Sequence, residues 1–265
     1  MTAVLMAAGV VGIMGLLFGV GLAWSSKIFH VEEDPRVAEI RGALPGANCG
    51  ACGYPGCEGC ATAIAQGKAG VRACPVGGEE LAEALSKILG VEVEQGERRV
   101  ARVRCNGSRN VSREKYVYHG IEDCFAASLV FAGHKSCQWG CLGNGTCRKA
   151  CPFGAIDIIG GVSVICQEKC RSCGLCIAAC PKKLIELVPV SKQFTVLCRS
   201  QDKGAATKQK CDVGCIGCTK CVKTCPVQAI EMTGAPLAAI DPEKCTNCGE
   251  CEKVCPTGAI RQITR

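Results

Sequence analysis

The longest apolar stretch lies at the start of the chain. From Ala3 to Trp24 the sequence has 22 residues without a charged side chain, close to the roughly 20 that cross a bilayer. Trp24 stands where an interfacial aromatic belongs, and Lys27 follows it. Because positive charges gather on the cytoplasmic flank of membrane helices, this end is expected to face the cytoplasm. The pattern predicts a single-pass anchor over residues 1–27 in the cell (inner) membrane, with the C-terminal domains in the cytoplasm.

Beyond the anchor, the apolar positions define short, separate elements. Asp34 precedes a proline, which is the form of an N-cap followed by a first helical residue. Residues 79–89 carry leucine and isoleucine at helical spacing and are followed by Gly90, so they predict an amphipathic helix. Alternating or β-prone residues over 100–105 and 194–198 each predict one short strand.

The second half of the chain repeats itself. A Cys-Pro pair recurs at Cys151, Cys180, Cys225 and Cys255, and the second member of each pair follows the first by 29 and 30 positions. Four similar units in two pairs indicate an internal duplication, and each pair is expected to form a small α+β module. The predicted divisions are a transmembrane anchor (1–27), a small, mainly α four-cysteine domain (28–96) and two modules in tandem (97–192 and 193–265).

Cysteine is the outlier in the composition, with 26 of 265 residues. Disulfide scaffolds are secreted and usually short, whereas this N-terminus lacks the basic region and small-residue cleavage site of a signal peptide. Aromatic residues make up only 4% of the chain, so a large packed core has few big side chains to draw on. Reduced thiolates that hold zinc or iron–sulfur clusters in the cytoplasm are the better interpretation.

The most specific cysteine motif lies at the end of the chain. Cys245, Cys248, Cys251 and Cys255 follow the spacing C-x2-C-x2-C-x3-C-P, which is typical of bacterial two-cluster ferredoxins. The same motif occurs at Cys215, Cys218, Cys221 and Cys225. Because the fourth cysteine of such a run ligates the other cluster, Cys255 is expected to complete the earlier cluster and Cys225 the later one. Zinc sites typically use two C-x2-C pairs, so this pattern disfavours zinc.

The preceding module is less regular. One complete motif consists of Cys170, Cys173, Cys176 and Cys180. Its partner contains Cys137, Cys141, Cys147 and Cys151. Asn144 stands where the middle cysteine of the pattern belongs, so one ligand is missing. Cys137 is expected to replace it, although Cys211 stands at the equivalent place in the second module, where no replacement is needed.

The domain over residues 28–96 has a different pattern, C-x2-C-x4-C-x16-C, set among glycines. Its cysteines are Cys49, Cys52, Cys57 and Cys74. Four thiolates suit either one [4Fe–4S] cluster or one zinc ion, and Cys60, three residues after Cys57, is a competing ligand. Counting this site, the chain is expected to hold about five [4Fe–4S] clusters.

Six cysteines remain without an assigned ligand role. They are Cys60, Cys105, Cys124, Cys166, Cys198 and Cys211. The simplest interpretation is that they are small buried hydrophobes. Cys105 nevertheless precedes Cys137 much as Cys198 precedes Cys211, which indicates shared structure, although no recognisable ligand run predicts a sixth cluster.

The charge is divided unevenly along the chain. Residues 28–96 carry 5 basic and 10 acidic side chains, whereas residues 97–265 carry 25 and 14. An oxidised [4Fe–4S] cluster on four thiolates adds about −2, which leaves roughly −7 and +3 for the two regions. The protein as a whole is therefore not strongly basic, and no nucleic-acid partner is expected. No dinucleotide-binding glycine loop and no nucleophile with a base is present, so no catalytic residue is predicted.

Taken together, the apolar helix, the stretch Asn48-Cys49-Gly50-Ala51-Cys52-Gly53-Tyr54-Pro55-Gly56-Cys57 with Cys74-Pro75, and the ferredoxin motifs resemble the B subunit of the Rnf ion-translocating ferredoxin:NAD oxidoreductase complex. The resemblance covers essentially the whole chain and fits the longer form, with two dicluster modules. It also favours Cys57 over Cys60 as a ligand.

The resemblance implies a function that the spacing alone does not show. Such a protein takes electrons from soluble reduced ferredoxin and relays them to integral membrane subunits that carry flavin and iron–sulfur clusters. The complex couples NAD reduction to Na⁺ or H⁺ translocation. Two alternatives remain open, namely an iron–sulfur input subunit of another membrane oxidoreductase such as a hydrogenase, and a zinc scaffold without a redox role.

Overall fold

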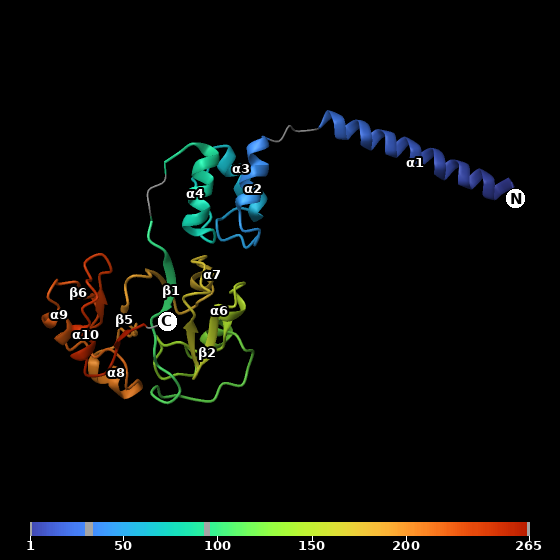
Figure 1. Ribbon diagram of the computed structural model, residues 1–265. Helices are drawn as coiled ribbons and strands as arrows, with labels where there is room; N and C mark the ends of the chain where they lie inside the picture. The colour runs from blue at the N-terminus through green and yellow to red at the C-terminus, as the bar shows by residue number, and fades with distance from the viewer. Residues whose placement is uncertain (1, 30–33, 93–95, 264–265) are drawn as a thin grey trace.

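The computed structural model describes residues 2–29, 34–92 and 96–263. Within these ranges the chain forms an N-terminal helix, a three-helix domain and two small α+β modules, each with two two-stranded antiparallel sheets (Figure 1). The fold class predicted from the sequence is therefore confirmed.

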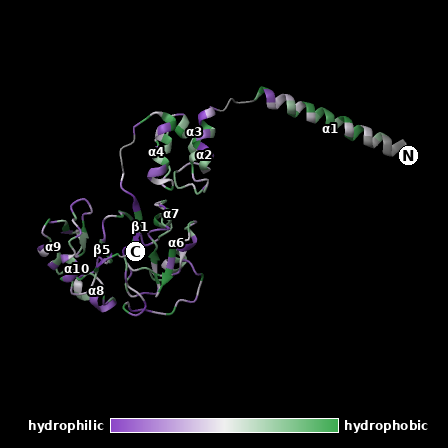
Figure 2. Ribbon diagram, viewed as in Figure 1, coloured by the Kyte–Doolittle hydropathy of each residue, from purple (hydrophilic) through white to green (hydrophobic). Residues whose placement is uncertain are grey.

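The helix α1 (Thr2–Ile28) covers the predicted anchor. Its segment Gly9–Ile28 has a mean hydropathy of 1.7, and none of its side chains is buried inside the molecule. Figure 2 shows the apolar character running along this helix. In the described part of the chain, α1 is the one helix that is long and apolar enough to cross a membrane.

Three helices pack together to form the domain that follows. Asp34 caps the first of them by accepting a hydrogen bond from the amide of Arg36 at 2.9 Å, as the sequence predicted. Ile40, Ile64 and Leu85 are almost fully buried at the centre of the domain. The three helices are α2 (Pro35–Ala43), α3 (Gly56–Ala65) and α4 (Gly78–Leu89).

The first α+β module is closed by pairing of its first and last strands, β1 and β4, in antiparallel register. Val100, Ile156 and Leu184 form its small core together with several of its cysteines. Its elements are β1 (Arg99–Val103), α5 (Cys124–Leu129), α6 (Thr146–Lys149), β2 (Ile156–Ile159), β3 (Val162–Ile165), α7 (Leu175–Ala178) and β4 (Ile185–Pro189).

The second module repeats this closure, because β5 pairs with β8 and β6 with β7. Phe194, Val196 and Ile260 lie in its core, again with cysteines. Its elements are β5 (Phe194–Val196), α8 (Gly204–Lys210), α9 (Lys220–Thr224), β6 (Ile230–Met232), β7 (Ala238–Ile240), α10 (Glu250–Lys253) and β8 (Ile260–Gln262).

The two modules lie side by side (Figure 1). The buried guanidinium of Arg102 donates to the Thr195 hydroxyl across the contact at 3.1 Å. Backbone hydrogen bonds also cross it: Asn106 N to Leu197 O (3.2 Å), Arg113 N to Lys210 O (2.9 Å) and Asp212 N to Val111 O (2.8 Å). This contact fixes how the cysteines of one module face those of the other.

Candidate iron–sulfur sites

The second module brings together the four cysteines that the sequence grouped across its two motifs. Cys215, Cys218, Cys221 and Cys255 line one cavity of about 20 Å³. Burial raises the pKa of the Cys221 thiol, and the neighbouring Cys215, Cys218 and Cys255 raise it further. A site of crowded thiols is unfavourable for bare thiolates and suits a positively charged iron centre that replaces their protons. Their role as ligands stays a prediction.

The other two regular motifs have the same surroundings. Burial raises the pKa of Cys251 to about 11, with Cys245 and Cys248 adding to the shift. In the first module burial raises the pKa of Cys176 to about 12, with Cys170 and Cys173 adding to the shift. Cys151, the fourth cysteine of the other motif in this module, also raises the pKas of Cys173 and Cys176.

A tight loop around the middle cysteine gives these motifs their shape. The residues on either side of Cys173, Cys218 and Cys248 all have positive φ, a conformation that favours glycine or asparagine. The loop around Asn144 has the same conformation although it carries no thiol. The flanking pairs are Gly143/Gly145, Ser172/Gly174, Gly217/Thr219 and Asn247/Gly249.

At the irregular site the structure gathers a cysteine that the sequence analysis left unassigned. One cavity of about 20 Å³ is lined by Cys124, Cys141, Cys147 and Cys180. The thiols of Cys124 and Cys180 also raise the pKa of Cys147, after burial. Cys137, which the sequence placed here, lines a different cavity. The structure therefore offers Cys124 as the fourth thiol.

Asn144 has a positioning role in this arrangement. Its side-chain amide donates to the carbonyl of Asp123 at 3.3 Å, at the turn that starts α5. The Asp123 carboxylate accepts from the Thr146 hydroxyl at 2.8 Å, and that hydroxyl accepts from the amide of Cys124 at 2.6 Å. The Asn144 loop thus holds the segment that carries Cys124, the candidate for the fourth thiol.

The four-cysteine domain has five thiols around its cavity. Cys49, Cys52, Cys57 and Cys74 line it as predicted, and Cys60 lies there too. Burial raises the pKa of Cys60 to about 12, with Cys52 and Cys74 close by. The position of Cys57 is set by a turn: its amide, at the start of α3, donates to Asn48 Oδ1 at 2.8 Å, and Gly56 has a φ of 78° beside that oxygen. A cavity with five thiols satisfies the four-thiolate need of one cluster.

These thiols do not form a single-ion site in the described part of the chain. Across the described residues, no group of three or more His, Cys, Asp or Glu side chains comes close enough together to hold one metal ion. A zinc ion needs its four sulfurs about 2.3 Å from one point, whereas a cubane keeps them apart on its corners.

Comparisons with known families agree with this chemistry. A profile described as "4Fe-4S dicluster domain" matches residues 214–259, one described as "Putative Fe-S cluster" matches residues 44–76, and one described as "4Fe-4S binding domain" matches residues 167–183. The matches include the four motif cysteines of the four-cysteine domain, one motif of the first module and both motifs of the second module.

The chain is also similar to curated proteins over most of its length. It is 44% identical over 247 residues to the B subunit of the Na(+)-translocating ferredoxin:NAD(+) oxidoreductase complex of Acetobacterium woodii, covering 92% of this chain and 74% of that protein. It is 45% identical over 233 residues to the B subunit of the ion-translocating oxidoreductase complex of Methanosarcina acetivorans, covering 88% of both. The chain belongs to the family of Rnf B subunits.

As an Rnf B subunit, the protein is an iron–sulfur electron-transfer component of a membrane oxidoreductase complex. A relative from the proton-translocating complex of Clostridium ljungdahlii is 44% identical over 247 residues, which cover 92% of this chain and 87% of that protein. The family resemblance inferred from the sequence is confirmed, and it takes the place of the hydrogenase and zinc alternatives.

Cys124 is the ligand candidate that the sequence analysis missed. It lies 17 residues before Cys141, outside any ferredoxin spacing, at the first residue of the short helix α5. The only signal in the sequence was indirect: Asn144 left one site short of a thiol while six cysteines had no assignment. Proximity in the fold, not spacing, supplies the missing partner.

Proposed function

We propose that this protein accepts electrons from reduced ferredoxin and relays them to flavin-carrying and iron–sulfur subunits in the membrane. The complex would couple the resulting NAD reduction to translocation of Na⁺ or H⁺, as the names of its relatives say of them. When bound, each [4Fe–4S] cluster takes up or releases one electron. The residues of this chain would hold the clusters and set their order.

The observation that carries this proposal is that successive cysteine sites adjoin one another. In the second module Cys221 lies close enough to Cys251, which belongs to the other motif, to raise its pKa, after burial. In the first module Cys147 is likewise a neighbour of Cys176. Cys49 of the four-cysteine domain lies close enough to Cys173 to raise its pKa, after burial. The sites thus follow each other from module to domain.

The exposed end of this series lies in the second module. Among the 26 cysteines, all of which the structure describes, only Cys218 and Cys248 are exposed to solvent. Each occupies the middle position of a ferredoxin motif. A soluble donor reaches an exposed site most easily, so we assign electron entry to this module.

The opposite end is tied to the membrane anchor. Cys49 follows Lys27 by 22 residues, which span at most about 75 Å when extended. The nine-residue helix α2 lies within that link and shortens it. With Lys27 on the cytoplasmic side, the four-cysteine domain stays near the bilayer, where membrane subunits can accept electrons.

The proposed ligand sets combine motif spacing with the thiols that share a cavity or lie close to one another, and the assignment of Cys225 rests on motif spacing. For the irregular site we replace Cys137 with Cys124, and for the four-cysteine domain we keep the four motif cysteines. The five sets are Cys49/52/57/74, Cys124/141/147/180, Cys170/173/176 with Cys151, Cys215/218/221/255, and Cys245/248/251 with Cys225.

The test is Cys57→Ala in the assembled, membrane-bound complex. Ferredoxin is expected to reduce the clusters of both modules as before, whereas electron delivery to the membrane flavins and NAD falls at least tenfold. Cys166→Ala, which changes a cysteine outside the five proposed ligand sets, is the matched control. Wild-type turnover by a Cys57→Ala complex that is shown to lack the four-cysteine-domain cluster would contradict the proposed order.

A further inference from the structure

Four cysteines that have no place in the five sites meet in one cavity between the two modules. Cys105 and Cys137 come from the first module, and Cys198 and Cys211 come from the second. The cavity has a volume of about 20 Å³, equal to that of the cavities at two of the ferredoxin-type sites. Three of its cysteines were unassigned in the sequence, and the fourth is displaced from its predicted site.

The two halves of this cavity are built in the same way. Cys105 and Cys198 each follow the first strand of their module, β1 and β5. Cys137 and Cys211 each begin a turn in which their carbonyl accepts from a glycine amide three residues later, at 3.2 Å and 3.4 Å. The internal duplication therefore places one pair of thiols from each repeat at the shared contact.

Every sulfur in the cavity receives a backbone N–H group. The amide of Cys141 donates to Cys105 Sγ at 3.3 Å, and that of Ser200 donates to Cys198 Sγ at 3.4 Å. Hydrogen bonds from the amides of Trp139 and Val213 act on the sulfurs of Cys137 and Cys211 in the same way. Burial raises the pKa of Cys137, Cys198 and Cys211, and these backbone donors oppose that shift by stabilising the thiolate, which is the form that binds metal.

A buried cation faces the same cavity. Lys135 is 1% exposed, and its ammonium donates to the carbonyls of Gly107 and Gly161 at 2.6 Å and 3.0 Å. Within the described residues no carboxylate forms an ion pair with it. A lysine is almost never fully buried without an opposite charge. Four thiolates on an iron–sulfur cluster supply that charge, because such a cluster carries about −2.

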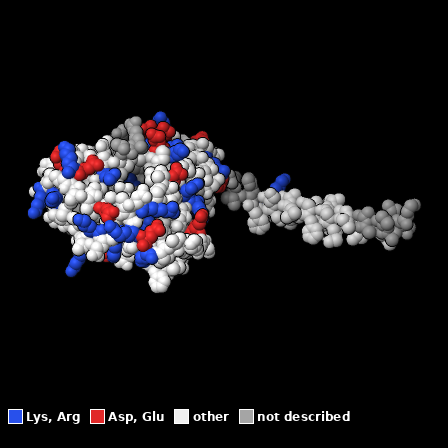
Figure 3. Space-filling view, turned by 90° about the horizontal axis from the view of Figure 1, so that it is seen from below, with Lys and Arg blue, Asp and Glu red and all other residues white. Residues whose placement is uncertain are grey.

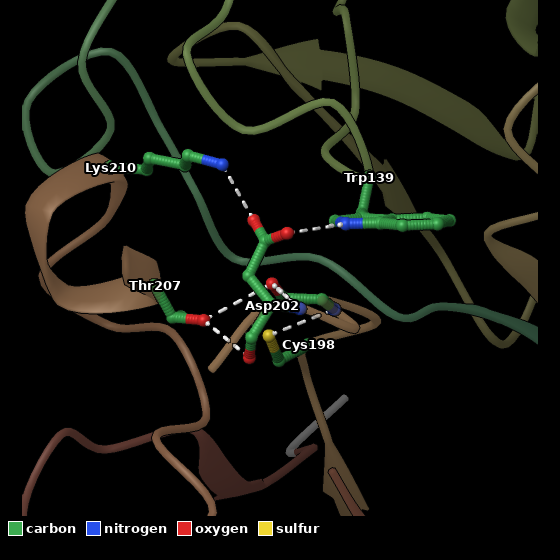
Figure 4. Close-up of polar contacts among 6 residues, drawn as sticks. Trp139, Cys198, Asp202, Thr207 and Lys210 are labelled. Carbon is green, nitrogen blue, oxygen red and sulfur yellow. Dashed lines mark hydrogen bonds and ion pairs between the residues drawn. The ribbon is translucent and has the colours of Figure 1, made fainter. Parts of the chain in front are cut away.

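A second set of contacts holds the cavity walls in place (Figure 4). The Asp202 carboxylate accepts from the Trp139 indole at 3.4 Å and from the Lys210 ammonium at 2.8 Å. Trp139 and Lys210 come from different modules, so Asp202 ties together the two segments that carry Cys137 and Cys211. Such supporting contacts are typical of metal sites.

We propose that Cys105, Cys137, Cys198 and Cys211 bind a sixth [4Fe–4S] cluster at the contact between the two ferredoxin modules. The thiols show no single-ion geometry, and Gly107 leaves the space between two of them open: Cys105 Sγ and Cys211 Sγ both lie within 3.6 Å of the point where a Cβ on this glycine would stand. All four cysteines are free.

The position of this site gives it a bridging role, which rests on the proposed function. Cys105 Sγ is hydrogen-bonded to Cys141, a cysteine of the irregular site in the first module. Cys198 is a neighbour of Cys215, a cysteine of the exposed site in the second module. The cluster would therefore receive single electrons from the second module, which ferredoxin reduces, and pass them to the first module on the way to the membrane.

The test is the metal content of the anaerobically purified full-length chain. The proposal predicts about 24 iron and 24 sulfide per chain, whereas five sites predict about 20 of each. Cys198→Ser is expected to lower both by about four, and Cys166→Ser, a cysteine away from the cavity, is expected to lower neither. Spectra of the remaining clusters report whether the variant keeps its fold.

Two results of these measurements would contradict the proposal. A wild-type content near 20 iron overturns it without reference to any variant. One zinc or one iron lost from Cys198→Ser would indicate a single-ion site. These counts do not depend on electron transfer, so they stay valid if the proposed donor or acceptor is wrong. In the assembled complex, Cys198→Ser should in addition slow the passage of electrons from the second module to the first at least tenfold.

Discussion

At the scale of single residues, the exchange of a cysteine for Asn144 decides which thiol completes a site. Asn144 keeps the tight loop of a ferredoxin motif and uses its amide to hold the turn before Cys124. The proposed fourth ligand, Cys124, comes from another segment, and Asn144 holds that segment in place. Cys137 does not line the irregular site and lies with Cys105 in the cavity between the two modules.

This exchange predicts a rescue. Cys124→Ser should remove one cluster, or about four iron, because the cavity then has three thiols. Adding Asn144→Cys to that variant should restore the iron, since the new thiol stands at the regular ferredoxin position. The matched control is Asn144→Cys combined with Cys137→Ser. Here the lost thiol lines the cavity between the modules and the added thiol lies at the irregular site, so no iron should be restored. Iron restored in the control but not in the Cys124→Ser background would reverse the assignment.

At the scale of elements, α1 is the part of the chain that depends on lipid for its burial. Its side chains are exposed along Gly9–Ile28, and leucine, valine and glycine dominate the sequence. An arginine at the centre of such a helix costs about 2.5–3.5 kcal/mol on insertion scales, whereas one at the end can extend to the interface. Leu17→Arg should therefore shift the protein from the membrane fraction to the soluble fraction after alkaline washing.

Ser26→Arg is the control for that experiment, because it adds the same charge beside Lys27 at the end of the helix. Its product should stay in the membrane fraction. Equal membrane retention of Leu17→Arg, in cells without the other subunits, would show that α1 is not the anchor. Expression without partners matters, because contacts with other subunits would retain the chain by themselves.

The elements also show how far sequence alone reaches. Periodicity and caps predicted α2, α4, β1 and β5, since local hydrogen bonding and the spacing of apolar residues determine each of them. The regular motifs also predicted which cysteines of the second module line one cavity, because the loop formed by each run of three cysteines depends on local spacing. Cys124 and the cavity shared by Cys105 and Cys211 depend on how distant segments pack, and spacing carries no information about that. The domain boundaries at residues 27, 96 and 192 stay predictions.

At the scale of the whole molecule, the part of the chain that carries the two exposed cysteines also carries a positive balance. Residues 97–265 keep a positive balance of roughly +3 after the charge of four clusters, or about +1 with the proposed sixth. Figure 3 shows many Lys and Arg side chains on one face of the molecule. Lys220 and Lys223 are exposed in or beside α9, within five residues of the exposed Cys218. An acidic ferredoxin would meet a local positive surface at the site that we assign to electron entry.

Electrostatic steering of this kind predicts a dependence on salt. The Debye length is about 8–10 Å at physiological ionic strength and about 3 Å at 1 M, so the rate of cluster reduction by ferredoxin should fall roughly tenfold between low and high salt. Lys220→Glu with Lys223→Glu should lower the low-salt rate and flatten the salt dependence. Lys68→Glu makes a similar change in the four-cysteine domain and should do neither. A stopped-flow rate that is indifferent to salt, or equally sensitive to Lys68→Glu, would place the docking surface elsewhere.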